Sequence, residues 1–302
     1  MRYSYIKFLL LLIFLSACSS KNVVGGSDEL RPLAGSPNLP DCYPAIGWEE
    51  IDAAPNNNIV FFGELHGTVE GPAHVGEYLC AVASSGKSVA LALEIPNSFS
   101  DGLMLGWNSD SPKAVWLDQM DGFWNAPETH QDGRKSVAML ALMARAHILH
   151  VEGLDVSIEF FSPSRKQYED FGKPEGIAWL YEAEAEKLRS LASHYDQVIV
   201  LVGNIHAMRE ADFLDFKTTA SFLGDNSVSL NMLADGGEAW NCVSGTCIAR
   251  TVKRNRDYSK IEDSQSNPMG LTDLLSPAFD GYVLLGGVNA SPPAISAKES
   301  SD

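Results

Sequence analysis

Short apolar runs alternate with longer stretches of helical periodicity through most of this 302-residue chain. Continuous apolar runs of this length are typical of strands that are buried on both faces, as in a parallel sheet covered by helices. The nearly or fully apolar runs of strand length are 59–62, 89–93, 156–161, 198–202 and 282–285.

Helical patterns separate these runs. Val75, Leu79 and Val82 share one helical face, and the segments 136–149 and 177–195 are long enough for crossover helices. The alternation predicts the α/β class, with a mostly parallel central sheet covered by helices on both faces.

Residues 223–260 interrupt the alternation and predict a small antiparallel excursion at a sheet edge. Cys242 and Cys247 flank a Val-Ser-Gly-Thr segment there, which is typical of a hairpin tip closed by a local disulfide. That pairing leaves Cys42 to pair with Cys80, and two disulfides are expected of a chain in an oxidising compartment. A thiolate metal site is the weaker alternative, because the paired CxxC knuckles of zinc modules are missing.

The amino-terminal pattern predicts a signal peptide over residues 1–17. Arg2 and Lys7 precede the apolar run 8–15, which is too short to span a bilayer, and small residues come just before Cys18. This block resembles the bacterial lipobox, which implies cleavage before Cys18 and acylation of that cysteine as a stable lipid anchor. The alternative is an ordinary secretory signal with Cys18 at the junction by chance.

The remaining chain divides by composition into a tether at 18–41, one α/β domain at 42–293 and a polar tail at 294–302. The tether is rich in Ser, Gly, Pro and Asn and has no apolar period, so it cannot bury enough apolar surface to order itself. Ser19, a non-acidic residue after the lipidated cysteine, implies sorting to the outer membrane of a bacterial envelope, with the domain facing the periplasm.

Net charge restricts the partners of the domain. The formal charge of the chain is -17, and it becomes -19 without residues 1–17, which hold Arg2 and Lys7 and no acid. An acidic domain repels phosphate backbones and anionic headgroups. The sequence therefore excludes nucleic acid as a partner, and it predicts contact with the bilayer only through the lipid.

Titratable side chains follow three of the predicted strands at the point where each strand ends. Glu64 and His66 come after the first run, Glu94 follows the second, and His206 follows the run 198–202. Because parallel strands share their carboxyl ends, these side chains should converge at the edge where such folds bind ligands. The pKa of a titratable group shifts at the rim of a dry core, and catalysis becomes feasible there.

These motifs resemble the superfamily that contains the ChaN-like haem-binding lipoproteins, the erythromycin esterases and the TIKI/TraB-like proteins. The resemblance covers roughly residues 55–293. It is carried by Gly63-Glu64-x-His66, Glu94, Asp132-Gly133-Arg134, Gly203-Asn204-x-His206, and the ending from Asp280-Gly281 to Ser291-Pro292-Pro293.

The resemblance implies a site rather than one reaction, because this superfamily is divided between esterases, metal-dependent proteases and haem-binding proteins. By that resemblance His66 is the base or a metal ligand, Glu64 and Glu94 are its carboxylate partners, and His206 is the second imidazole.

Three hypotheses of function follow. The first is a hydrolase that activates water on a small ester or amide, since a neutral histidine oriented by a carboxylate can take a proton from water. The second is a lipoprotein that binds haem, or a divalent metal held by His66, Glu64 and His206, without turnover. The third is a partner-binding protein whose site is closed by an ion pair between Arg134 and Glu64 or Glu94. The absence of an HExxH helix favours a hydrolase that needs no tightly bound metal.

Three further residues are candidates for contact with a small-molecule ligand. Arg134 either binds a substrate anion or forms a structural bridge with a nearby carboxylate. Asn204 either contacts the ligand or braces its loop. Trp124 lies in an aromatic stretch that predicts either a lid over the site or a satellite core.

Overall fold

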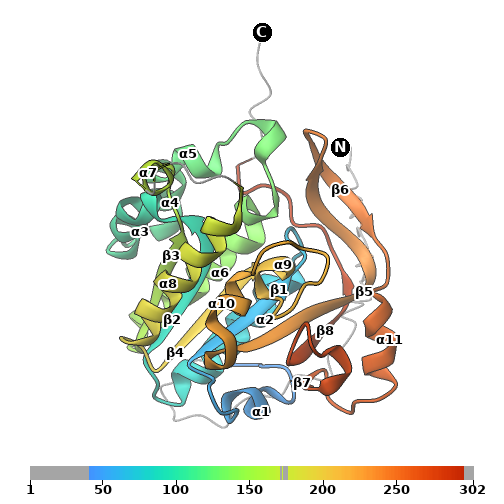
Figure 1. The fold of residues 1–302 in the computed structure, drawn as a ribbon. Helices are drawn as coiled ribbons and strands as arrows, with labels where there is room; N and C mark the ends of the chain where they lie inside the picture. Colours follow the sequence, from blue (N-terminus) through green and yellow to red (C-terminus); the bar gives the residue numbers. More distant parts are fainter. Residues whose placement is uncertain (1–40, 171, 173–175, 296–302) are drawn as a thin grey trace, which may run out of the picture.

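The structure is a computed structural model that describes residues 41–170, 172 and 176–295. These residues are organised around one central sheet (Figure 1). Its strands are β1 (Ile59–Glu64), β2 (Val89–Pro96), β3 (Val156–Ser162), β4 (Gln197–Gly203), β5 (Val228–Val243), β6 (Thr246–Val252), β7 (Met269–Leu271) and β8 (Gly281–Val288).

Most of the sheet is parallel. Its strand order is β3-β2-β4-β1-β5-β8-β7, and β6 pairs with β5 outside this path. The pairs from β3 across to β8 are parallel, whereas β7 pairs with β8 and β6 with β5 in the antiparallel sense. The predicted fold class, a mostly parallel sheet with a small antiparallel excursion, is confirmed.

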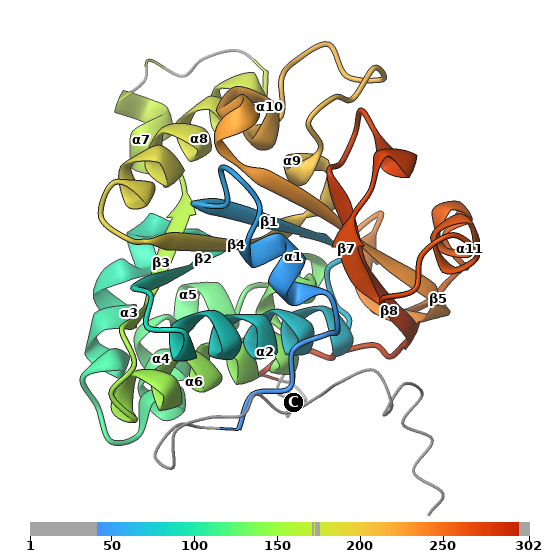
Figure 2. The same cartoon turned by 90° about the horizontal axis from the view of Figure 1, so that it is seen from below.

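Helices cover both faces of the sheet (Figure 2). The helices α2 to α6 lie over one face, and α8, α9 and α10 lie over the other. The helices are α1 (Trp48–Asp52), α2 (Glu70–Ser84), α3 (Ser100–Trp107), α4 (Pro112–Gln119), α5 (Asp121–Trp124), α6 (Val137–Val151), α7 (Arg165–Asp170), α8 (Ala178–Ala192), α9 (Asn204–Ala207), α10 (Thr219–Leu223) and α11 (Arg256–Glu262). Short 3₁₀ turns are η1 (Asn97–Phe99), η2 (Glu128–His130), η3 (Gly133–Lys135), η4 (Gly224–Asn226) and η5 (Asp273–Leu275).

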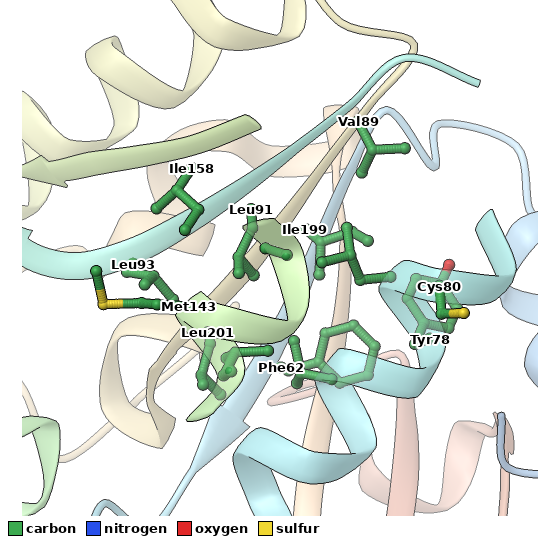
Figure 3. Close-up of a cluster of buried hydrophobic side chains, with 14 of the residues drawn as sticks. Phe62, Tyr78, Cys80, Val89, Leu91, Leu93, Met143, Ile158, Ile199 and Leu201 are labelled. Atoms are coloured by element: carbon green, nitrogen blue, oxygen red, sulfur yellow. The ribbon is translucent and has the colours of Figure 1, made fainter. Parts of the chain in front are cut away.

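The core between α2, α6 and the sheet is built from the predicted apolar runs (Figure 3). Phe62, Leu91 and Ile199 come from three neighbouring strands and belong to one buried cluster with Tyr78 of α2, whose ring lies 5.1 Å from that of Phe62. Each fully buried side chain of this size contributes about 1.5 to 3 kcal/mol by leaving water. Burial on this scale fixes the strand ends, and therefore the positions of the side chains that follow them.

Strand β5 shows where the antiparallel excursion begins. Its residues Val228 to Asn231 pair in parallel with Val60 to Gly63 of β1, and antiparallel pairing with β6 starts only at Gly237. The apolar pattern did not separate this parallel half, because Ser229 and Asn231 interrupt it. Ser229 is nevertheless buried, and its backbone N–H donates to Asp280 Oδ2 at 2.7 Å.

Both predicted disulfides are present. Cys42 is bonded to Cys80 of α2, which ties the segment before α1 to the first crossover helix. Cys242 and Cys247 close the tip of the β5–β6 hairpin. The predicted signal peptide, Cys18 and most of the tether lie outside the described residues, as does most of the polar tail. Within the described ranges, no helix has the length and apolar character needed to cross a membrane.

Candidate functional site

The carboxyl edge of the sheet brings the four predicted site residues together. Glu64 is the last residue of β1, and His66 lies in the turn that follows it. Glu94 stands where the register of β2 with β3 shifts, between Leu93 and Pro96. His206 is in α9, directly after β4. Hydrogen bonds or ion pairs connect all four side chains, so the predicted convergence of Glu64, His66, Glu94 and His206 is observed.

His66 is held between two carboxylates. Its Nδ1 lies 2.9 Å from Glu64 Oε1, and its Nε2 lies 3.2 Å from Glu94 Oε2. Both carboxylates are buried, whereas 23% of the His66 side chain is exposed. A ring whose two nitrogens both face carboxylates is bound most strongly as the imidazolium, which donates at both positions.

Glu94 is the centre of the polar cluster. Its Oε2 also accepts from the backbone N–H of Gly203 at 3.0 Å, and its Oε1 accepts from Arg134 Nη1 at 2.6 Å. His206 Nε2 lies 3.9 Å from the same Oε1 atom, which is too long for a hydrogen bond. Both histidines and Arg134 therefore face one buried carboxylate.

His206 has a carboxylate partner of its own, Glu184 of α8. Its Nδ1 lies 2.8 Å from Glu184 Oε2, and Glu184 is completely buried. Hydroxyl groups satisfy the carboxylate further: Thr219 donates to Oε2 at 2.7 Å and Ser162 to Oε1 at 3.1 Å. The site therefore contains two separate histidine–carboxylate pairs.

Sequence reasoning did not identify Glu184. The signal that could have revealed it is its place in the apolar stripe of α8, where Tyr181, Ala185 and Leu188 are also buried. A carboxylate at such a position needs a partner to offset its desolvation. Tyr181 shares this face and packs against the ring of His206 with a centroid distance of 4.6 Å.

Burial and opposite charges shift the pKa values of the cluster. Burial lowers the pKa of His66, but the charges and hydrogen bonds of Glu94 and Glu64 outweigh it and raise the pKa to about 10. For Glu94 burial opposes ionisation, but His66, His206 and Arg134 together hold its pKa below the ordinary value. Burial raises the pKa of Glu64 above its ordinary value.

The pKa of His206 is also raised. Burial lowers it, and the hydrogen bond with Glu184 and the charges of Glu94 and Glu184 more than offset this effect. Unlike Nε2 of His66, Nε2 of His206 has no hydrogen-bond partner among the described residues. Both nitrogens of His66 therefore have carboxylate partners, whereas only one nitrogen of His206 has a hydrogen-bond partner among the described residues.

Close backbone contacts hold the turn that carries His66. Gly67 has a φ of +91°, and a Cβ there would overlap the carbonyl oxygen of Trp240. The backbone N–H of Trp240 donates to Gly67 O at 2.9 Å, and that of Ser291 donates to the same oxygen at 2.8 Å. A Cβ on Gly133 would overlap the backbone of Gly67, so η3 also packs directly on this turn.

Gly71 makes room for Glu64. A Cβ added to Gly71, near the start of α2, would lie 2.6 Å from Glu64 Oε2. That oxygen has no hydrogen-bond partner among the described residues, although it is buried. The Glu64 carboxylate is therefore held between the first turn of α2, which lies against Oε2, and His66, which bonds to Oε1.

The three predicted ligand contacts have different outcomes. Arg134 forms the structural bridge, because its Nη2 donates to Asp132 Oδ2 at 2.7 Å while its Nη1 donates to Glu94. Asn204 begins α9 next to Gly203 and is half-buried. The assignment of Trp124 as a ligand contact is wrong, since its side chain has 0% exposure and belongs to the core.

A metal ion or a haem fits this donor set poorly. In the ranges that the structure describes, no group of three or more His, Cys, Asp or Glu side chains is arranged to hold a metal ion. Both ring nitrogens of His66 face carboxylates. For haem, Nε2 of His206 is an available ligand atom, but the guanidinium of Arg134 is already paired with Asp132 and Glu94 and so does not offer a charge to the propionates.

Several solved structures align with this chain. A succinoglycan biosynthesis protein aligns with a TM-score of 0.55 and 9% sequence identity, over 88% of this chain and 96% of that one. An erythromycin esterase mutant in its open conformation aligns at 0.49 with 11% identity, over 82% and 93% of the two chains. The haem-binding ChaN of Campylobacter jejuni aligns at 0.41 with 10% identity, over 63% and 86%.

These likenesses concern the fold alone. An erythromycin esterase and a ChaN protein, two of the three groups named by the sequence resemblance, occur among the similar structures, and the likeness to the succinoglycan biosynthesis protein agrees with the predicted fold. No protein-family model matches the sequence, and no curated protein matches it in sequence. The activity must therefore be argued from the geometry of the site.

Proposed function

We propose that this protein is a hydrolase that activates water against a small ester or amide at the two-histidine site. The observation that carries the proposal is the pair of imidazoles, each hydrogen-bonded to a buried carboxylate, that meet at Glu94 on the carboxyl edge of the sheet. A histidine that is oriented by a buried carboxylate and keeps one nitrogen open can take a proton from water.

The alternative of an inert, closed network is less well supported. The ion pair between Arg134 and Glu94 agrees with that alternative, because it neutralises one carboxylate of the site. However, His66 and His206 keep exposed side-chain fractions of 23% and 14%, and Nε2 of His206 has no hydrogen-bond partner within the described part of the chain. A network closed by ion pairs would leave neither ring accessible, whereas both rings keep contact with solvent.

A turnover screen tests the proposal. The full-length protein is incubated with p-nitrophenyl acetate, aliphatic acetate and butyrate esters, and simple amides, and product acid is measured. We expect turnover by the wild type and a loss of about 100-fold or more in His206→Asn, since one acid–base group contributes about 10² to 10⁴-fold. Turnover should also fall in His66→Asn, because the charge that holds Glu94 is removed. His194→Asn is the matched control, because His194 is exposed and lies in the turn after α8.

Two outcomes would contradict the proposal. One is equal turnover in the wild type and in both site variants, which would place the activity elsewhere. The other is no turnover of any probe by a protein whose circular dichroism shows that it is folded.

We also propose that the domain is exported and anchored to the outer membrane by a lipid on Cys18. The disulfides Cys42–Cys80 and Cys242–Cys247 support export, because disulfides persist in oxidising compartments such as the periplasm. Metabolic labelling with palmitate in a bacterial host should label the wild type and not Cys18→Ala. Label retained by Cys18→Ala, or a wild-type protein found only in the soluble fraction, would contradict the anchor.

A further inference from the structure

The two histidines of the site differ in the number of ring nitrogens that have a hydrogen-bond partner among the described residues, and this difference gives them different roles. We propose that His206, oriented by Glu184, takes the proton from the attacking water and then gives it to the leaving group, and that His66, with both nitrogens bound by carboxylates, positions Glu94. The inference rests on the proposed hydrolase function. It differs from the role that the sequence resemblance implies, in which His66 is the base.

Geometry favours His206 as the proton acceptor. Glu184 Oε2 lies 2.8 Å from Nδ1, so the neutral ring carries its proton on Nδ1 and presents the lone pair of Nε2. That nitrogen is 3.9 Å from Glu94 Oε1 and forms no hydrogen bond with any described residue. A base must have a free lone pair, and His206 is the imidazole that offers one.

Glu184 is built to hold this orientation. It is completely buried, and its two oxygens accept from Thr219, Ser162 and His206. A carboxylate with three donors is fixed in position. Its role is to position His206, and it does not itself contact the reacting atoms.

His66 has a different role. Both of its nitrogens face carboxylates, at 2.9 Å for Glu64 and 3.2 Å for Glu94, so the ring is held as the imidazolium and no N–H is left for a leaving group. Its contact holds Glu94 in place beside His206, whose Nε2 lies 3.9 Å from Glu94 Oε1. His66 is therefore a positioning residue.

The proton balance of the reaction closes with these roles. Water loses a proton to Nε2 of His206 while its oxygen bonds to the acyl carbon. The bond from that carbon to the leaving oxygen or nitrogen then breaks, and the leaving group receives this proton from Nε2 of His206. His206 is neutral again after the turnover, and His66 keeps its proton throughout.

The charged groups around His206 agree with this assignment. Glu184 and Tyr181 face it from α8, Glu94 faces it from β2, and His66 faces it from the turn after β1. Two carboxylates favour the imidazolium of His206, and His66 opposes it, so the pKa of His206 rises above 6.5. His66, between two carboxylates at hydrogen-bond distance, keeps its proton up to about pH 10.

Nitrogen NMR tests the assignment without any substrate. The full-length protein is labelled with ¹⁵N-histidine, and His66→Gln and His206→Gln assign the two rings. As the pH rises from 6 to 11, we expect His206 to lose its proton first, from Nε2, while both nitrogens of His66 stay protonated. The assignment is overturned if His66 loses its proton before His206, or if neutral His206 carries its proton on Nε2.

A kinetic comparison adds a readout that a purely structural role would not change. In Glu184→Gln we expect kcat for the best probe ester to fall about 10² to 10⁴-fold with little change in KM, because the uncharged amide neither fixes the tautomer nor stabilises the imidazolium. The lower limb of the pH profile should move to lower pH. Glu159→Gln is the control, since it removes a carboxylate that pairs with Lys187 of the same helix as Glu184.

The outcomes separate this inference from the proposed function. A protein that shows the expected proton distribution but hydrolyses no probe contradicts only the hydrolase proposal. A hydrolase with the opposite proton distribution, or one in which Glu184→Gln and Glu159→Gln have the same kcat and pH profile, contradicts only the division of roles.

Discussion

Replacing Glu94 with glutamine should lower the pKa of His66 while leaving the fold intact. Glutamine keeps the size of the side chain and an oxygen that accepts from the backbone N–H of Gly203, which now lies 3.0 Å away. What it removes is the negative charge 3.2 Å from His66 Nε2. Arg134 keeps its pair with Asp132, so it is not left without a partner.

The magnitude follows from the distance. Two unit charges 3.2 Å apart interact by about 5 kcal/mol at an effective dielectric constant of 20. That figure is an upper limit, because 23% of the His66 side chain is exposed to water. Opposite charges in partly buried sites change a pKa by about 1 to 3 pH units, so the pKa of His66 should fall from about 10 to between about 7 and 9.

The assay is the NMR titration of His66 in wild type, Glu94→Gln and the control Glu159→Gln. An unchanged His66 titration in Glu94→Gln, or an equal change in the control, would refute the electrostatic reasoning.

The same interaction makes folding stability depend on pH. Because the folded pKa of His66 lies above its unfolded value, its contribution is fully present below about pH 6.5 and is lost as the pH rises to about 10. Over this interval the wild type should lose stability relative to His66→Asn by up to about 1.4 kcal/mol per pH unit. Urea unfolding at several pH values measures the difference, and parallel curves for the two proteins would contradict it.

Two further predictions concern the support of the site. Gly71→Ala should destabilise the fold by about 1 to 3 kcal/mol, because the added methyl group would lie 2.6 Å from Glu64 Oε2. In Gly76→Ala, on the same helix, the nearest atom to the added methyl group is 3.4 Å away, so this control should be neutral or slightly stabilising. Equal stability of the two variants in urea unfolding would contradict this prediction. Replacing Cys42 and Cys80 together with serine should cost about 4 kcal/mol, the loop-closure entropy of a separation of 38 residues, and unchanged thermal unfolding would show that the bridge adds no stability.

The sheet could be predicted from sequence because its strands are buried on both faces. The runs that became β1, β2 and β4 are nearly uninterrupted apolar segments of strand length, which is the pattern expected of central strands in a parallel sheet. The parallel half of β5 could not be recognised in the same way. Ser229 and Asn231 lie at buried positions there, since Ser229 bonds to a neighbouring loop through Asp280, and local sequence does not reveal such a contact.

The site was predictable to the extent that it depends on strand ends. Glu64, His66 and Glu94 lie at or just beyond the carboxyl ends of strands, so the topology of a parallel sheet determines where they lie. Glu184 comes from the middle of a helix, and its pairing with His206 depends on how α8 packs against the sheet. Trp124 was misassigned because an aromatic residue in a Gly- and Asp-rich stretch is equally compatible with a core, and the packing of α5 decides the matter.

The roles of the two histidines illustrate what only three-dimensional contacts supply. From sequence, His66 is the prominent imidazole because two carboxylates accompany it. In the structure those same carboxylates occupy both of its nitrogens, and the less prominent His206 keeps one nitrogen open. A close carboxylate is therefore evidence of a site, while the number of free nitrogen atoms indicates the role.

The central claim is that a histidine of this site activates water for direct attack on the substrate. The most direct test is hydrolysis of the best probe ester in H₂¹⁸O, with mass spectrometry of the product acid and of the peptides that contain Glu64 and Glu94 after a single turnover. The account predicts one ¹⁸O atom in the product acid and none in either carboxylate. Label in a glutamate, or a product acid without label, would contradict it.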